Sequence, residues 1–269
     1  MNQAIRVSVI DFVNAWPVTW GFLRGAVDGI ELITDIPSAC ADRLRRGEVD
    51  AGIIPSIEAA RIPGVRLVRG VGIASRERVR SVLLAARVPL REVRQVAVDI
   101  SSRSSAAMVR ILLEDLVGIQ PEFHPAAPDL PEMLRHHDAA LLIGDRALTA
   151  DLAGLHVLDL AQGWRELTGG PFVFAVWAVR AGIPPEPFLW SRDFARRHAD
   201  DIVREAAART GKDEVLIREY LDGNLHHDLG SEDEAALAEF YRRAALRGLI
   251  PSAELPPFAG VPLVPRRDA

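Results

Sequence analysis

The sequence predicts an α/β protein of two lobes, with mainly parallel sheets, a ligand cleft between the lobes and a helical C-terminal part. Two observations carry this prediction: a weak internal repeat, and two apolar strands placed where the chain would cross between lobes. The 269 residues suffice for two lobes of ordinary size, and a hydrophobic share of 49% is enough for full cores.

The repeat begins with two similar β-rich runs. Residues 7–11 (VSVID) precede a polar turn around Asn14 and then Pro17, a residue typical of a first helical turn. Residues 96–100 (VAVDI) precede a serine-rich segment and a helix with one apolar face. The second run starts 89 residues after the first.

Later landmarks agree with this spacing. Helical segments give way to buried strands at Asp50 and again at Asp138, 88 residues further on. Short strand candidates at 31–33 and 122–124 occupy matching places between them. Separate α/β units also resemble one another by chance, but three landmarks at nearly equal spacing favour a duplicated strand–helix–strand–helix–strand unit, hence two lobes.

Two further strands, at 80–86 and 172–179, predict the connections between the lobes. If the chain leaves after one and returns after the other, the first lobe comprises residues 1–86 and 178–269, and the second comprises 87–177. Binding sites in such folds lie between the lobes, at the carboxyl ends of strands.

The remaining chain, from about Pro187 to Leu249, predicts helices. Apolar residues recur at helical spacing over Asp193–Arg209 and Ser231–Arg247. The five prolines after residue 250 predict an extended strap or a disordered end.

Composition excludes several classes of protein. A net charge of −5 argues against a nucleic-acid partner. The single cysteine, Cys40, excludes a disulfide framework, and no metal site is predicted because the paired histidines lack chelating spacing. The N-terminus shows no signal peptide and no apolar run is long enough to span a bilayer, which predicts a cytoplasmic protein without a membrane segment.

Single polar residues follow several predicted strands and should face the cleft. These residues are Asn14, Ser56, Ser81 and Asp145. Asp145 is equally well interpreted as the N-cap of the segment that follows it.

Four serines at the start of a predicted helix indicate an anion site. They are Ser101, Ser102, Ser104 and Ser105. A helix N-terminus offers unpaired N–H groups and a partial positive charge, and nearby hydroxyl groups add donors. One serine would suffice as an N-cap, which is the alternative, but four exceed what capping needs.

Trp164, Thr168 and Gly169 form a second candidate group before an apolar strand. A bulky ring with close backbone approach would suit a planar ring ligand. A packed loop beneath the second lobe explains the same residues equally well. The residues therefore predict a cleft for a small organic anion, without separating an enzyme from a binding protein.

Several of these segments together resemble a known family. They are residues 12–17, 47–55, 80–82, 101–105, 143–148 and 164–180. In order and in kind they resemble the chorismate dehydratase family of the futalosine route to menaquinone. That family is similar in fold to type 2 periplasmic binding proteins but lacks a secretion signal.

The resemblance implies elimination of water from chorismate to give 3-[(1-carboxyvinyl)oxy]benzoate, a hydro-lyase reaction that requires no metal, flavin or nicotinamide cofactor. It assigns carboxylate binding to the Ser101–Ser105 helix start, Asn14 and Ser81. The proton acceptor is either Asp145 or a carboxylate of the substrate.

Other functions remain open. The 1,4-dihydroxy-6-naphthoate synthase of the same pathway shares the fold and usually carries a histidine in the second-lobe loop. No histidine lies between His156 and His198 here, which favours the dehydratase. A solute-binding protein for a small organic anion would share the cleft without catalysis. A ligand-sensing regulatory domain would need a DNA-binding module or a basic stripe, and neither is visible.

Overall fold

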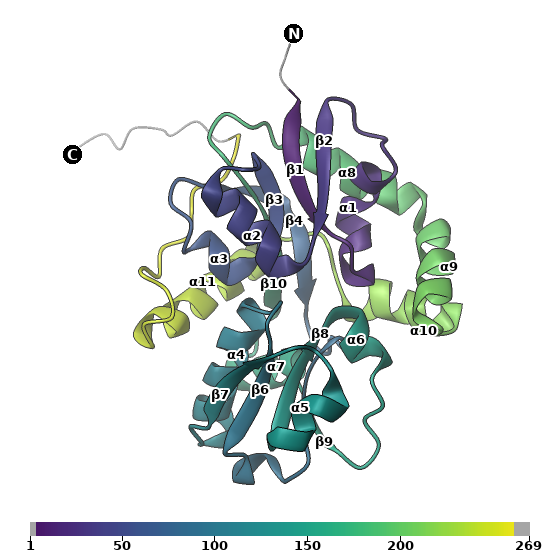
Figure 1. Ribbon diagram of the computed structural model, residues 1–269. Coiled ribbons are helices and arrows are strands. Elements are labelled where there is room, and N and C mark those ends of the chain that lie inside the picture. The colour runs from purple at the N-terminus through teal and green to yellow at the C-terminus, as the bar shows by residue number, and fades with distance from the viewer. Residues whose placement is uncertain (1–3, 261–269) are drawn as a thin grey trace, which may run out of the picture.

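Two five-stranded sheets form the two halves of the molecule, one above the other in Figure 1. The structure is a computed structural model and describes residues 4–260. The first sheet, in the order β2-β1-β3-β10-β4, contains β1 (Ile5–Ile10), β2 (Ile30–Asp35), β3 (Ala51–Pro55), β4 (Arg66–Ser75) and β10 (Phe172–Val179). The second, in the order β7-β6-β8-β5-β9, contains β5 (Val82–Ala86), β6 (Gln95–Asp99), β7 (Glu122–Ala126), β8 (Ala139–Ile143) and β9 (His156–Asp159).

The two sheets have the same topology. In the first, β1 lies parallel to β2 and β3, and β10 is antiparallel to β3 and β4. In the second, β6 lies parallel to β7 and β8, and β5 is antiparallel to β8 and β9. Val7 pairs with Ala51, and Val96 pairs with Ala139 in the corresponding place. The predicted two-lobe α/β architecture is therefore confirmed, with one antiparallel strand in each otherwise parallel sheet.

The lobe boundaries fall at other positions than expected, because β5 and β10 each belong to the sheet that the chain has just entered. The sequence prediction left residues 82–86 in the first lobe, but β5 pairs within the second sheet. It left most of 172–179 in the second lobe, but β10 pairs within the first. A crossing strand needs hydrogen-bond partners for its backbone in the sheet it enters. We therefore propose lobe borders within residues 76–81 and 169–171.

Helices flank both sheets. In the first lobe these are η1 (Val13–Ala15), α1 (Trp16–Leu23), α2 (Pro37–Arg46) and α3 (Ser56–Ala59). In the second they are η2 (Leu90–Glu92), α4 (Ser104–Leu112), η3 (Leu113–Val117), α5 (Leu130–His136), α6 (Gly144–Thr149) and α7 (Leu160–Thr168). Among residues 4–260, no helix is long and apolar enough to cross a membrane.

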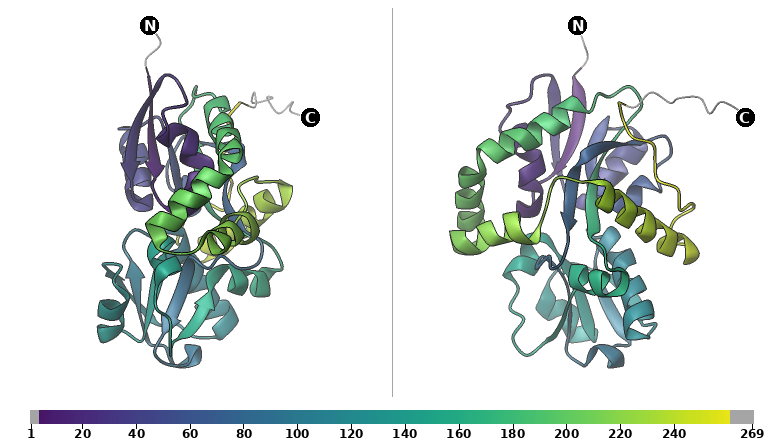
Figure 2. Two further views of the ribbon diagram at one scale, coloured as in Figure 1. Left: turned by 90° about the vertical axis from the view of Figure 1, so that its right-hand side faces the viewer. Right: turned by 180° about the vertical axis from the view of Figure 1, so that it is seen from behind.

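The C-terminal part is helical, as predicted. It contains α8 (Glu186–Arg197), α9 (Ala199–Thr210), α10 (Glu214–Arg218), η4 (Glu219–Asn224) and α11 (Ser231–Leu246). The helix expected over Asp193–Arg209 is interrupted at His198, which separates α8 from α9. Seen from behind, α8 to α10 run down one side of the first lobe, and α11 lies across the junction of the lobes (Figure 2).

Part of the proline-rich end forms the expected strap. The backbone N–H of Leu67 donates to the carbonyl of Pro257 at 2.9 Å, and Ala259 N–H donates back to Leu67 at 2.8 Å. The strap thus pairs with β4 at the edge of the first sheet. Residues 261–269 lie outside the described part of the chain.

A close backbone approach at Gly72 gives a stability prediction. A Cβ atom added there would lie 2.5 Å from Leu229 Cδ1 and 2.8 Å from the carbonyl oxygen of Ala175. We expect Gly72→Ala to lower the free energy of unfolding by about 1–3 kcal/mol, measured by urea denaturation. In the matched Gly223→Ala variant the new Cβ would have its nearest neighbour at 3.8 Å, so no loss is expected. Equal denaturation midpoints for the two variants would contradict this.

Candidate active site

A cavity with an empty volume of about 460 Å³ lies between the lobes. The first lobe contributes Ile10, Phe12, Asn14, Pro37, Pro55, Ile73, Phe174 and Ala175. The second lobe contributes Val82, Ser102, Arg103, Ser104, Ser105, Ile143 and Gly144. Many of these residues sit at or just beyond strand ends, where ligand sites of open α/β sheets occur.

The walls of this cleft are mostly apolar, with a few polar groups. Phe12 and Phe174 supply the aromatic surface, and the polar groups come from Asn14, the serines and Arg103. Among the lining residues of the described chain, none is an aspartate, a glutamate or a histidine. The cleft therefore offers neutral hydrogen-bond donors and one cation, but no side chain that would serve as a general base near neutral pH.

The predicted anion site lies in the cleft. Ser104 begins α4, so the first N–H groups of the helix have no partner within it. Ser102 Oγ is buried without a hydrogen-bond partner and belongs to the cleft wall. Ser105 lines the same wall. An anionic ligand would satisfy these donors and interact favourably with the helix dipole.

Asn14 lies in η1, immediately after β1, and lines the cleft as predicted. Its backbone carbonyl accepts a hydrogen bond from Nε2 of His227 at 3.2 Å. Burial lowers the pKa of His227 to about 4, so the ring is neutral near pH 7 and carries its proton on Nε2 to make this bond. His227 thus holds the backbone that presents the Asn14 side chain to the cleft.

Three other predicted residues lie behind the cleft wall rather than in it. Ser56 Oγ donates to the carbonyl of Val173 at 2.7 Å. Ser101 Oγ donates to Asp99 at 2.6 Å. Ser81 Oγ accepts from the Tyr220 hydroxyl group. All three serines are buried, and none lines the cavity. The hydroxyl group of Ser56 bonds the backbone of β10, whereas those of Ser81 and Ser101 bond the side chains of Tyr220 and Asp99.

Ser81 directly follows the first crossing between lobes. Arg80, with φ of 61°, is the only non-glycine residue with positive φ in the described chain. The carboxylate of Asp159 accepts hydrogen bonds from the backbone N–H groups of Val79 and Arg80, at 2.8–3.1 Å. This strained turn sets the direction in which β5 enters the second sheet.

Asp145 joins the two lobes and does not cap its own helix. One carboxylate oxygen accepts from the backbone N–H of Val13 at 3.0 Å, and the other pairs with Arg209 at 3.0 Å. Burial raises the pKa of Asp145, although both partners counteract the rise. Since both oxygens are engaged and the residue is outside the cavity lining, the structure does not support it as the proton acceptor.

The ring-binding role considered for Trp164, Thr168 and Gly169 is not supported, because none of them lines the cavity. Trp164 is fully buried and packs against Phe172 and Phe240, with ring centroids 5.1 and 5.8 Å away. Thr168 donates to the Trp164 carbonyl, and Gly169 ends α7 with φ of 79°. The group is packed, as in the alternative interpretation, but Trp164 and Thr168 lie on helix α7 rather than in a loop.

The sequence prediction missed Phe12, Phe174 and Arg103. All three residues lie inside segments that carried the family resemblance, so those segments contained the signal. Phe174 lies within a wholly buried strand, where the sequence does not distinguish a cleft side from a core side. In the described residues, no three His, Cys, Asp or Glu side chains are grouped as a metal site requires.

Two matching sheets joined by two crossings around a cleft define a protein with the periplasmic-binding-protein fold. A solved structure from Archaeoglobus fulgidus is similar with a TM-score of 0.74 and 20% identity, covering 93% of this chain and 99% of that one. The periplasmic aliphatic sulphonate binding protein of Escherichia coli is similar with a TM-score of 0.63 and 17% identity, and the match covers 94% of this chain and 95% of that one. These likenesses establish the fold.

The sequence comparisons establish the family. The model described as menaquinone biosynthesis matches residues 5–246, and the chain belongs to this family. A chorismate dehydratase of Thermus thermophilus is 30% identical over a 242-residue alignment, and the match covers 81% of this chain and 88% of that protein. A chorismate dehydratase of Campylobacter jejuni is 26% identical over 241 residues, 87% and 94% of the two chains.

The buried imidazole of His227 predicts a specific pH dependence of stability. The unfolded chain takes up a proton near the ordinary pKa of 6.5, whereas the folded state does so only near pH 4. Stability is therefore fully present above pH 6.5 and is lost as pH falls toward 4. We expect His227→Gln, which keeps a donor but does not titrate, to show a shallower loss of unfolding free energy over this range, measured by urea denaturation.

The exposed His136 provides the matched control. His136→Gln should keep the wild-type pH dependence because it leaves the buried imidazole in place. Parallel curves for wild type and His227→Gln would show that burial of this ring does not govern the effect.

Proposed function

We propose that this protein is a chorismate dehydratase, a hydro-lyase that converts chorismate to 3-[(1-carboxyvinyl)oxy]benzoate in menaquinone biosynthesis. Two relatives over most of the chain carry that name. The observation that carries the proposal is the cleft, in which the start of α4 and uncharged donors face apolar and aromatic walls.

Chorismate matches this composition. It has a cyclohexadiene ring, a carboxylate on the ring and a second carboxylate on the enolpyruvyl ether. The N–H groups at the start of α4 and the unpaired hydroxyl group of Ser102 suit one carboxylate, and the Asn14 side chain would donate from the opposite lobe. Phe12 and Phe174 offer apolar surface to the ring between them.

Elimination requires the loss of a hydrogen from the ether-bearing carbon and of the neighbouring hydroxyl group. Because no carboxylate or imidazole lines the described cleft, we assign the proton to the enolpyruvyl carboxylate of the substrate itself. The C–H electrons move into the ring toward its carboxylate. They then return to form a double bond between the ether-bearing carbon and its neighbour, as the bond from that neighbour to the hydroxyl group breaks. The hydroxide leaves with the abstracted proton as water, and the ring becomes aromatic.

In this mechanism the protein supplies position and electrostatic stabilisation. Donors aimed at the ring carboxylate stabilise the negative charge that builds on it before hydroxide leaves. Such donors accelerate the reaction only to the extent that they bind this charge more strongly in the transition state than in the substrate. The mostly apolar walls of the cleft strengthen each of these interactions.

Ultraviolet spectroscopy of chorismate incubated with the purified protein tests the function directly. The dehydratase gives many turnovers of one aromatic product, whose mass is that of chorismate less one water. A solute-binding protein would leave chorismate unchanged apart from a stoichiometric bound fraction. A protein that neither binds nor converts chorismate but acts on a later intermediate would support the naphthoate synthase alternative.

Serine and asparagine variants test the site. We expect Ser102→Ala and Asn14→Ala each to lower kcat/KM by about 10- to 100-fold, the loss of one hydrogen bond to a charged group. Ser102→Ala should not lower the free energy of unfolding, because its hydroxyl group is buried without a partner.

Thr168→Ala is the control for these variants. Its hydroxyl group bonds the backbone of α7 outside the cleft, so kcat/KM should stay within about twofold of wild type. Wild-type turnover in both cleft variants would refute the assignment of these residues.

A further inference from the structure

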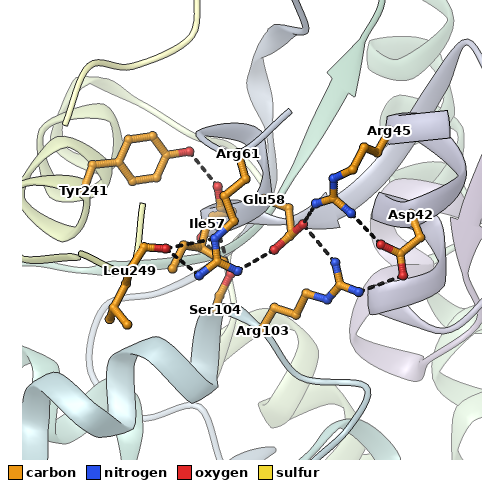
Figure 3. A network of polar contacts seen from close by, with 10 residues as sticks. Asp42, Arg45, Ile57, Glu58, Arg61, Arg103, Ser104, Tyr241 and Leu249 are labelled. Carbon is orange, nitrogen blue, oxygen red and sulfur yellow. Dashed lines mark hydrogen bonds and ion pairs between the residues drawn. The ribbon is translucent and has the colours of Figure 1, made fainter. Parts of the chain in front are cut away.

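Arg103 is the one cation in the cleft wall among the described residues, and its side chain reaches into the other lobe. It belongs to the second lobe, at the N-cap of α4. Its guanidinium group contacts Asp42 on α2 at 2.7 Å and Glu58 on α3 at 2.9 Å, both in the first lobe. Figure 3 shows these contacts bridging the two parts of the chain.

Of the two carboxylates that Arg103 contacts in the first lobe, that of Glu58 is buried. The Glu58 side chain is only 1% exposed, and it contacts Arg45, Arg61 and Arg103. A buried carboxylate is far more sensitive than an exposed one to the removal of a partner. This sensitivity makes the contact with Arg103 a strong constraint on the relative position of the lobes.

The neighbouring residue makes a second contact between the lobes. Ser104 Oγ accepts a hydrogen bond from the backbone N–H of Ile57 at 3.1 Å and lies 3.1 Å from Ser56 Oγ. Positions 103 and 104, which open the anion site, are thus both held by the start of α3. The N–H groups of α4 face the other wall of the cleft only while these contacts persist.

The cluster also has a net charge. Three guanidinium groups, of Arg45, Arg61 and Arg103, surround the two carboxylates of Asp42 and Glu58. One positive charge is left beside the serine segment. This excess favours an anion at the α4 start without placing a free lysine or arginine on it.

We propose that Arg103 is a positioning residue for the reaction: by binding Asp42 and Glu58 it holds the lobes closed and completes the anion site at the start of α4. The proposal rests on the proposed function for its substrate, but the closure itself does not depend on which anion binds. Without this contact the closed form is only partly populated. The apparent affinity for substrate then falls in proportion to the fraction of molecules that are closed.

This mechanism predicts a particular kinetic signature. We expect Arg103→Gln to raise KM for chorismate by at least about tenfold while kcat changes by less than about threefold, since saturating substrate restores the closed form. Arg103→Lys, which keeps the charge but loses the two-pronged contact, should fall between Arg103→Gln and wild type.

Arg45→Gln is the matched control, because Arg45 contacts the same two carboxylates from within the first lobe. It removes the same single positive charge from the cluster as Arg103→Gln does, but it breaks no contact between lobes, so any rise in KM should be well below that of Arg103→Gln. Equal KM values for the Arg103→Gln and Arg45→Gln variants would overturn the proposal.

Hydrogen exchange provides a readout that needs no substrate. In the unliganded protein, the amide of Ile57 and the amides at 103–106 should exchange faster in Arg103→Gln than in wild type or Arg45→Gln. Unchanged exchange at these positions refutes the closure whatever the substrate proves to be. Faster exchange in a protein that does not convert chorismate would preserve the closure and refute the proposed function alone.

Discussion

The architecture depends on one constraint, the double passage of the chain between two sheets of identical topology. Each sheet takes its one antiparallel strand, β5 or β10, from chain that has just arrived from the other half. The two lobes are therefore joined by short segments whose backbone hydrogen bonds end in different sheets. The carboxyl ends of the central strands face one another across this junction, and the polar groups that follow them share a cavity. The strained turn at Arg80, tied to Asp159, lies at one of these passages.

Charged groups near the cleft mainly make contacts that join one lobe to the other. Asp145 binds the Val13 N–H group and Arg209 on one side, and Glu58 and Asp42 bind Arg103 on the other. Apart from Arg103, the cavity wall is left to uncharged donors, aromatic rings and aliphatic side chains. This division suits a substrate that carries its own negative charges, because an acidic side chain in the wall would repel it. It also suits a reaction whose driving force, formation of an aromatic ring, is stored in the substrate.

Helix termini and buried hydroxyl groups explain the rest of the wall. The start of α4 offers backbone N–H groups at fixed positions, which would suit the proposed binding of an anion. Ser56, Ser81 and Ser101 do not face the ligand, yet each fixes the segment on which a facing residue stands. His227 acts similarly on the backbone of Asn14. Hydrogen bonds of this kind, behind the cleft wall, keep the residues that line the cleft in fixed positions.

The sequence by itself determined the features whose signals are local. The repeat of β-rich runs and helix starts identified both sheets, and the serines before α4 identified a segment that lines the cleft, because strand periodicity and helix capping depend on neighbouring residues. Tertiary structure alone decided which side of a strand or helix faces the cleft. It placed Trp164 in a core with Phe172 and Phe240, and it placed Phe174 in the wall. It also brought Arg103 to Glu58 across 45 residues and His227 to Asn14 across 213, separations over which no local pattern specifies a contact.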